Sequence, residues 1–216
     1  MTTARIRRRS LLTGLSLLPL TAGCSVLPSP QAAQIYRLSP RVDDPPGPPI
    51  PNSSLAIDIP FASQSLDTDR IALTRGRTRF EYYADSVWTD RLPVLVQTLM
   101  VEAFESDGRL TQVSRDPFTL PHGYVLRTEI RQFQAEYPSV PSGPPEIAIT
   151  LELDLSAQPE GRLVASRLIS TGGRASQDKV DAVIMTFDAA TADALEQIVA
   201  WTVRSISADR TRRRRS

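Results

Sequence analysis

The sequence predicts an α+β fold, a two-layer sandwich in which a mainly antiparallel sheet carries two amphipathic helices on one face. Three observations lead to this prediction. Residues 146–155 alternate apolar and polar side chains, as a strand with one buried face does. Residues 90–106 and 178–205 repeat apolar side chains at helical spacing. The order strand, helix, three strands, helix leaves one sheet face that needs cover, and the two helices can supply it.

Strands open the predicted folded body. Apolar residues alternate over 55–59, and Pro60 ends the run. Two shorter runs, 70–74 and 79–83, flank Gly76 and predict a hairpin. We therefore expect the folded body to begin at residue 55.

The first helix is expected over residues 90–106. Thr89 is a suitable N-cap, and Asp90 would place a negative charge in the first turn, where the helix dipole favours it. Pro93 is tolerable there because the first amide groups of a helix lack partners within it. Gly108 supplies the usual stop.

Three strands are expected next, over 124–133, 146–155 and 162–170. The short turn at 158–161 predicts that the last two are an antiparallel pair. The final helix, 178–205, is long enough to allow a break near Asp188.

Arginines dominate residues 208–216, which we expect to form a disordered tail without apolar partners. The alternative is that these arginines attract anionic lipid headgroups.

Residues 1–23 have the features of a secretory signal peptide. Four arginines precede an apolar run over residues 11–22, which ends in small residues. The run is too short to span a bilayer, so we expect export and cleavage before Cys24. Arg8 and Arg9 also fit a twin-arginine signal, and Sec export remains equally open.

Cys24, the single cysteine, follows two small residues, an arrangement that resembles the lipobox of bacterial lipoproteins. We therefore expect palmitate-type acylation of Cys24 and a membrane anchor; the alternative is an unmodified thiol beside an ordinary cleavage site. Ser25, where an Asp would favour the inner membrane, favours the outer membrane, with the body facing the periplasm.

Residues 24–54 are rich in proline and predict a tether. The folded domain is then 55–207. Within the tether, 34–38 reads as an edge strand or a docking patch.

Charge and motifs exclude several classes of function. Nine of the 25 basic residues lie in residues 5–9 and 210–215, which leaves 16 against 24 acidic residues between 24 and 209, a net charge of −8. Such a body gives no support to nucleic-acid binding. The single histidine, His122, lies in a Pro-Gly turn, and neither a nucleophile elbow nor a phosphate-binding loop is present. We predict no catalytic residue, cofactor or metal site.

Four residues are candidate partner contacts. Tyr137 and Val140 lie in a second Pro-rich loop, where we expect them to be exposed. Tyr82 and Trp88 are aromatic residues for which a place in the core is the alternative.

The chain resembles the ABC-type transport auxiliary lipoprotein family over nearly the whole mature sequence. The matching features are the lipoprotein signal, Tyr36-Arg37-Leu38, the strand 55–60, Leu66-Asp67 with Arg70-Ile71, Tyr82-Tyr83 leading to Trp88 and Leu92-Pro93, the strand 126–133, and Val199-Ala200-Trp201. The resemblance implies a non-catalytic, periplasm-facing partner of an Mce-domain protein with its ABC permease and ATPase. It also implies phospholipid or other hydrophobic cargo and a homo-oligomer. The alternative is an outer-membrane assembly lipoprotein, like the one that assists lipopolysaccharide export.

Overall fold

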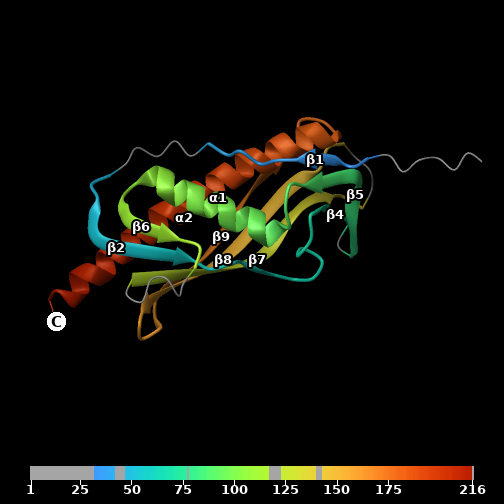
Figure 1. The fold of residues 1–216 in the computed structure, drawn as a ribbon. Helices are drawn as coiled ribbons and strands as arrows, with labels where there is room; N and C mark the ends of the chain where they lie inside the picture. Colours follow the sequence, from blue (N-terminus) through green and yellow to red (C-terminus); the bar gives the residue numbers. More distant parts are fainter. Residues whose placement is uncertain (1–31, 42–46, 77, 117–122, 140–142, 216) are drawn as a thin grey trace, which may run out of the picture. The chain divides into compact units, whose positions relative to one another are not determined.

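The computed structural model describes residues 32–41, 47–76, 78–116, 123–139 and 143–215, and these form nine strands and two helices (Figure 1). The strands are β1 (Gln34–Tyr36), β2 (Ile50–Ile57), β3 (Phe61–Ala62), β4 (Arg70–Arg75), β5 (Arg79–Trp88), β6 (Leu110–Ser114), β7 (Gly123–Tyr137), β8 (Glu146–Gln158) and β9 (Arg162–Arg174). The helices are α1 (Leu92–Asp107) and α2 (Val180–Arg213).

The long strand β7 is the centre of the sheet. On one side β8 pairs with it in antiparallel register, from Gly123 opposite Gln158 to Glu136 opposite Glu146. The antiparallel strand β9 follows β8 and forms the edge of the sheet among the described residues. On the other side of β7, the strands β2, β3 and β4 pair with successive parts of it, all in parallel.

The α+β class with two helices is confirmed, but the sheet is more mixed than predicted. Three ladders are antiparallel and five, each shorter, are parallel in the described part of the chain. Parallel neighbours require crossover connections, and α1 lies on the connection that leads from β2 to its parallel neighbour β6. The strands β3 and β6 were not predicted, because the first has two residues and the second carries one buried apolar side chain, Leu110.

Both helices cover the same face of the sheet. A small apolar gap between them and the sheet is lined by residues of α1, α2, β7 and β8. Every second side chain of β8 is buried on that face: Ile147, Ile149, Leu151, Leu153 and Leu155. The opposite face carries exposed ion pairs such as Arg131 with Glu152. The alternation predicted for this strand is therefore confirmed, and it determines which face of the sheet the helices cover.

Three aromatic rings join the helix layer to the sheet. Phe187 of α2 stacks on Phe133 of β7, with ring centroids 5.3 Å apart. Trp88, at the end of β5, meets both edge-on, at 5.4 Å from Phe187 and 6.1 Å from Phe133. Edge-to-face pairs contribute about 0.5–1.5 kcal/mol beyond their burial. Trp88 is 2% exposed, so of its two predicted roles the structure gives it the core.

The helix α1 begins later than predicted and ends where expected. Its N-cap is Arg91, without a side-chain cap, and Gly108 closes it in a left-handed conformation. The Thr89 amide instead donates to the Tyr36 carbonyl, at 3.0 Å. The Leu92 amide donates to the Thr68 carbonyl, also at 3.0 Å. Neighbouring strands and loops therefore take the place of the predicted Thr89 cap.

The folded body begins before residue 55, which corrects the predicted tether over 24–54. The strand β1 pairs in parallel with β5, and Leu38 beyond it is 1% exposed. The Ser39 amide donates to Asp188 Oδ1 of α2 at 2.6 Å, so this segment lies against the helix layer. The strand β2 starts at Ile50. The prediction of an edge strand or a docking patch at 34–38 is therefore confirmed, whereas the start of β2 at Ile50 was not predicted.

The helix α2 runs unbroken through Arg213, so the prediction of a disordered tail over 208–216 is wrong as far as that residue. Asp209 is buried, and its carboxylate accepts hydrogen bonds from Arg162 Nη2 at 2.8 Å and from the Tyr124 hydroxyl at 3.1 Å. Arg213 Nε lies 3.4 Å from the same carboxylate. A buried charge is stable only with such partners, and these hold the last turns of α2 against β7 and β9.

The close packing of two strands accounts for a glycine within β9. Gly172 lies within β9, opposite Ala148. A Cβ atom there would lie 2.0 Å from the Ile147 carbonyl oxygen. Close approach of two strands therefore requires glycine at this position.

We expect Asp209→Ala to lower the free energy of unfolding by about 2 kcal/mol, because it leaves the Tyr124 hydroxyl without its acceptor. Larger values are not expected, since Arg162 and Arg213 are 44% and 48% exposed and can rehydrate. Chemical denaturation measures the change. Asp193→Ala, an exposed change on the same helix, is the control and should stay within about 0.5 kcal/mol.

The same carboxylate predicts a dependence on acid. Burial opposes its ionisation, but hydrogen bonds from Arg162 and Tyr124 hold the pKa of Asp209 below its ordinary value of 3.8. Its contribution is therefore complete above that value and is lost as the pH falls through the lower pKa of the folded state. Denaturation at successive acid pH values should show a smaller decline for Asp209→Ala than for the unmodified protein. Equal declines would contradict the assignment.

Candidate functional site

The residues singled out from the sequence do not gather at one place. Cys24 and Val140 lie outside the described residues. Trp88 belongs to the core, and Tyr137 is 9% exposed, which corrects the prediction that Tyr137 is exposed. Tyr82 is half-buried on β5. Of the four predicted contact residues, Tyr82 is therefore the one that the described structure leaves partly accessible.

Tyr82 belongs to a small surface cluster. Its ring packs edge-on against Phe80 at 5.5 Å between centroids, and the Arg70 guanidinium lies 3.8 Å from its ring centre. Its hydroxyl donates to the Ser65 carbonyl at 3.0 Å. Phe80 is 39% exposed, which gives the cluster an apolar outer edge. The combination of an aromatic edge and a nearby cation suits contact with another protein.

Tyr137 forms a chain of hydrogen bonds at the end of β7. Its hydroxyl donates to Asp178 Oδ1 at 2.6 Å. The Tyr83 hydroxyl lies 2.9 Å from that of Tyr137, and since the latter gives its proton to Asp178, Tyr83 is the donor. The Arg75 guanidinium stands 4.7 Å from the centre of the Tyr137 ring. These contacts fix the start of α2 beside the ends of β4, β5 and β7.

Tyr36 holds the same end of α2 from the other side. Its hydroxyl donates to Asp181 Oδ1 at 2.9 Å, and Gln34 Oε1 lies 2.7 Å from it. Asp178 and Asp181 thus stand at the positive end of the helix dipole, each with a phenol as donor. The first turn of α2 is held by β1 and β7 together.

The environment of these phenols keeps them protonated. Burial, followed by the hydrogen bond to Tyr137, raises the pKa of Tyr83 far above its ordinary value of 10.0. Burial and then the hydrogen bond to Asp178 raise the pKa of Tyr137. A phenol with a raised pKa is a poor nucleophile and a poor base at neutral pH. The cluster is therefore suited to holding elements together rather than to transferring protons.

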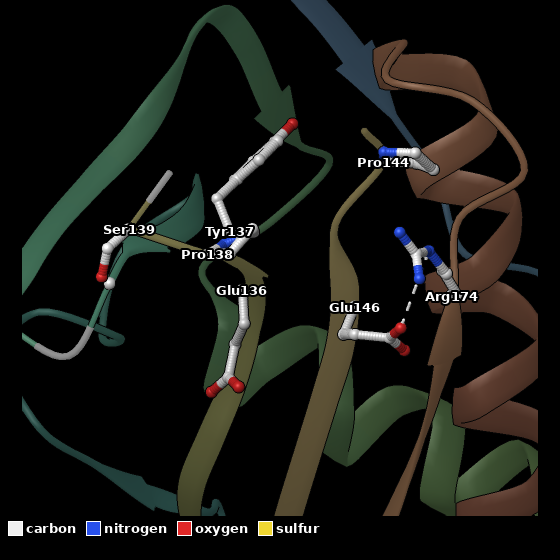
Figure 2. Close-up of a pocket in the computed structure, with 8 residues that line it drawn as sticks. Glu136, Tyr137, Pro138, Ser139, Pro144, Glu146 and Arg174 are labelled. Atoms are coloured by element: carbon white, nitrogen blue, oxygen red, sulfur yellow. Dashed lines mark ion pairs between the residues drawn. The ribbon is translucent and has the colours of Figure 1, made fainter. Parts of the chain in front are cut away.

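An open cavity of about 480 Å³ lies next to this cluster and is shown in Figure 2. Tyr137 and Glu136 project to opposite sides of β7, as neighbours on a strand do (Figure 2). Glu146 points toward Arg174, whose Nε lies 3.9 Å from Glu146 Oε1 (Figure 2). Glu136 accepts a hydrogen bond from Gln134 Nε2 at 3.1 Å. The remaining lining comes from Gly76, Pro138, Ser139 and Pro144.

The described side chains bring together neither a metal site nor a membrane span. In the ranges that the structure covers, no three histidine, cysteine or acidic residues are grouped so as to hold an ion. Within those same ranges, neither helix combines the length and apolar character needed to cross a bilayer. The cavity beside Tyr137 offers paired charges and proline rings, which can bind but do not form a catalytic set.

Several residues of this cluster were missed by sequence reasoning. Tyr83 and Asp178 lie 54 and 41 positions from Tyr137, so no local pattern connects them. Asp178 did carry one signal, because it is the first residue of the predicted final helix, where an acidic residue is favourable. Arg75 was read only as part of a hairpin turn.

Comparison with known proteins gives a family and a shared fold. A model of the family described as ABC-type transport auxiliary lipoprotein component matches residues 36–199. An uncharacterised protein of Bradyrhizobium diazoefficiens is 28% identical over 155 residues, which is 72% of this chain and 41% of that protein. The chain thus spans about two fifths of the length of that relative.

Solved structures share the arrangement of sheet and helices. The crystal structure of protein XCC0632 from Xanthomonas campestris is 26% identical and matches with a TM-score of 0.76, covering 83% of this chain and 99% of that one. The crystal structure of a second, uncharacterised protein is 15% identical and has a TM-score of 0.62, covering 79% and 98%. The second likeness extends to the fold alone.

We expect Tyr137→Phe to lower the free energy of unfolding by about 1–2 kcal/mol, because Asp178 and Tyr83 both lose a buried partner. Tyr82→Phe removes a single hydrogen bond at a half-exposed site and is the control, with a smaller loss. Raised phenol pKa values stabilise the fold below about pH 10 and lose that contribution as the pH rises further. Denaturation above that pH should therefore show a shallower decline for Tyr137→Phe. A loss no larger than that of Tyr82→Phe would contradict the hydrogen-bond chain.

Proposed function

Because this chain belongs to the family of ABC-type transport auxiliary lipoprotein components, we propose that it is the non-catalytic, lipid-anchored member of an ABC transport system that includes an Mce-domain protein. The permease and ATPase of that system would supply the membrane passage and the energy. The match to the family model over residues 36–199 is the observation that carries this proposal. Phospholipids or other hydrophobic solutes are the proposed cargo, and assembly into a homo-oligomer is part of the proposal.

Cys24 is the proposed site of the anchor. Its place after a signal-like segment supports acylation, and several acyl chains on one residue would hold the protein permanently, at about 0.8 kcal/mol per buried CH₂ group. The absence of Asp at position 25 supports the outer membrane, with the folded body in the periplasm.

The position of β1 limits how far the folded body stands from the anchor. Ten positions separate Cys24 from Gln34, the first residue of β1. An extended chain spans about 3.1 Å per residue, so the reach is roughly 30 Å rather than the length of a tether running to residue 54. This short reach supports a folded body that stays close to the membrane that holds the Cys24 anchor.

Tyr82 and its neighbours are the proposed contact with the transporter. Phe80 supplies an exposed aromatic edge, and Arg70 a cation above the Tyr82 ring. Buried aromatic and arginine anchors carry much of the binding energy in protein interfaces. Tyr137 would act indirectly, by fixing the strand ends that carry the neighbouring loop.

Cys24→Ser tests the anchor. Cells grown with labelled palmitate should label the unmodified protein and leave the Cys24→Ser protein blank, which should then be released in soluble form. Tyr82→Phe serves as the matched control and should label normally. An unmodified protein that takes up no palmitate would overturn the anchor.

Crosslinking in intact membranes followed by purification tests the partner. We expect recovery of an Mce-domain protein, and Tyr82→Ala should reduce this recovery at least tenfold if the surface cluster is the contact. Recovery of lipopolysaccharide-assembly factors in its place would favour the outer-membrane assembly function instead. Because the Tyr82 side chain is half-buried, a normal melting temperature of the variant is the control for folding.

A further inference from the structure

The last turns of α2 concentrate positive charge at one end of the fold. Arg210, Arg212, Arg213, Arg214 and Arg215, which we call the arginine tip, follow one another along the end of the helix. Two acidic residues, Asp209 and Glu160, and one further arginine, Arg162, lie beside them. The balance is six basic against two acidic groups in a body that is otherwise acidic.

Only part of this charge is needed to hold the fold. Arg162 pairs with the buried Asp209, and Arg210 donates to the carbonyls of Pro51 and Asn52, both at 2.8 Å. Arg212, Arg214 and Arg215 are exposed. A few arginines in the last turn are favoured by the helix dipole, but each contributes only about 0.3–1 kcal/mol there. The exposed three exceed what the helix end requires.

The arrangement of the tip suits many similar anions better than one. Successive residues of an α-helix point about 100° apart, so Arg210, Arg212 and Arg213 project in different directions around the helix axis, and Arg214 and Arg215 follow in the turn after it. An open cavity of about 590 Å³ lies beside the tip, lined by Arg210, Arg213 and Arg214 together with Asn52 and Gln158. A guanidinium group can donate two parallel hydrogen bonds to two oxygens of one phosphate. Charges that radiate in this way match a plane of phosphodiester groups, as a bilayer surface presents, rather than a single ligand of fixed orientation.

The tip lies at the opposite end of α2 from the start of the fold. Tyr36 of β1 is hydrogen-bonded to Asp181 in the first turn of α2, and the tip follows the last turn of the same 34-residue helix. A helix of that length extends about 51 Å. Figure 1 shows the final turns of α2 passing beyond the strands, away from β1. Within the described residues, β1 therefore lies near one end of α2 and the arginine tip lies at the other.

The helix layer would orient the tip toward an anionic surface. Its exposed side chains include Glu102, Glu105, Asp181 and Asp193. An anionic membrane would repel this layer and attract the arginine tip. End-on approach is thus the favoured orientation.

We propose that the arginine tip docks on anionic phospholipid headgroups of a membrane that faces the one holding the Cys24 anchor. This inference rests on the proposed anchor and extends it, because the protein would then connect two bilayers. Attraction falls with ionic strength, since exposed charges are screened by salt.

A vesicle-docking measurement tests the proposal. The processed full-length protein is loaded through its anchor into neutral phosphatidylcholine vesicles, and flotation measures the loading. A second population of vesicles, either neutral or containing phosphatidylglycerol, is then added, and fluorescence cross-correlation measures docking. We expect docking to the anionic vesicles alone and its loss at high salt.

Two matched variants separate the tip from general charge. Arg212→Gln, Arg214→Gln and Arg215→Gln together should weaken docking by roughly tenfold or more, because each basic residue near an anionic surface contributes about 1 kcal/mol. Arg37→Gln, Arg167→Gln and Arg204→Gln remove the same three charges elsewhere on exposed positions and should leave docking within about twofold. Equal losses in both variants would overturn the proposal.

The remaining outcomes are also distinguishable. Failure to load the neutral vesicles would overturn the anchor and with it the facing-membrane geometry. Normal loading without docking would overturn the arginine tip alone. Docking abolished by soluble glycerol phosphate at constant ionic strength would make the tip a site for a free phosphate compound and overturn the bilayer proposal. Equal docking to neutral vesicles would overturn it as well.

Discussion

The contact of Trp88, Phe133 and Phe187 is the interaction on which the rest of the structure depends. It joins the end of β5, the middle of β7 and the first half of α2 in one dry cluster. The stacking of Phe187 on Phe133 attaches the first half of the long helix to the central strand. The polar contacts at its two ends, Tyr137 with Asp178 and Arg162 with Asp209, then fix its position rather than create it.

Periodicity explains what could be predicted from the sequence. The alternation of β8 and the spacing of both helices report directly which side chains are buried, and Gly108 marks a helix end through its own conformational freedom. Long-range polar contacts leave no such trace. Asp209 meets Arg162 and Tyr124 across 47 and 85 positions, so its neighbouring arginines looked like a solvated tail. The alternation over 34–38 did indicate an edge strand or a docking patch, but it does not report that Leu38 is buried.

The candidate site was predictable only in part for the same reason. Trp88 and Tyr137 were predicted as possible contact residues, but the structure buries both, and their burial depends on partners in distant elements. Tyr82 kept its accessibility because its partners, Arg70 and Phe80, lie on the same exposed hairpin. The predicted contact residues depend on which side chains the core leaves accessible, and the periodicity of the core says little about those.

The outer strand β9 has a consequence for how molecules of this protein behave at close quarters. Within the described part of the chain its thirteen residues pair with β8 alone, and a sheet edge of this kind can pair with a further strand. The strand carries Arg162, Arg167 and Arg174 and no acidic residue. If two copies met edge to edge in antiparallel fashion around Leu168, Arg162 of each would face Arg174 of the other. Repulsion between like charges would therefore oppose the edge-to-edge pairing of two copies. It would not oppose the pairing of β9 with a strand rich in carboxylates.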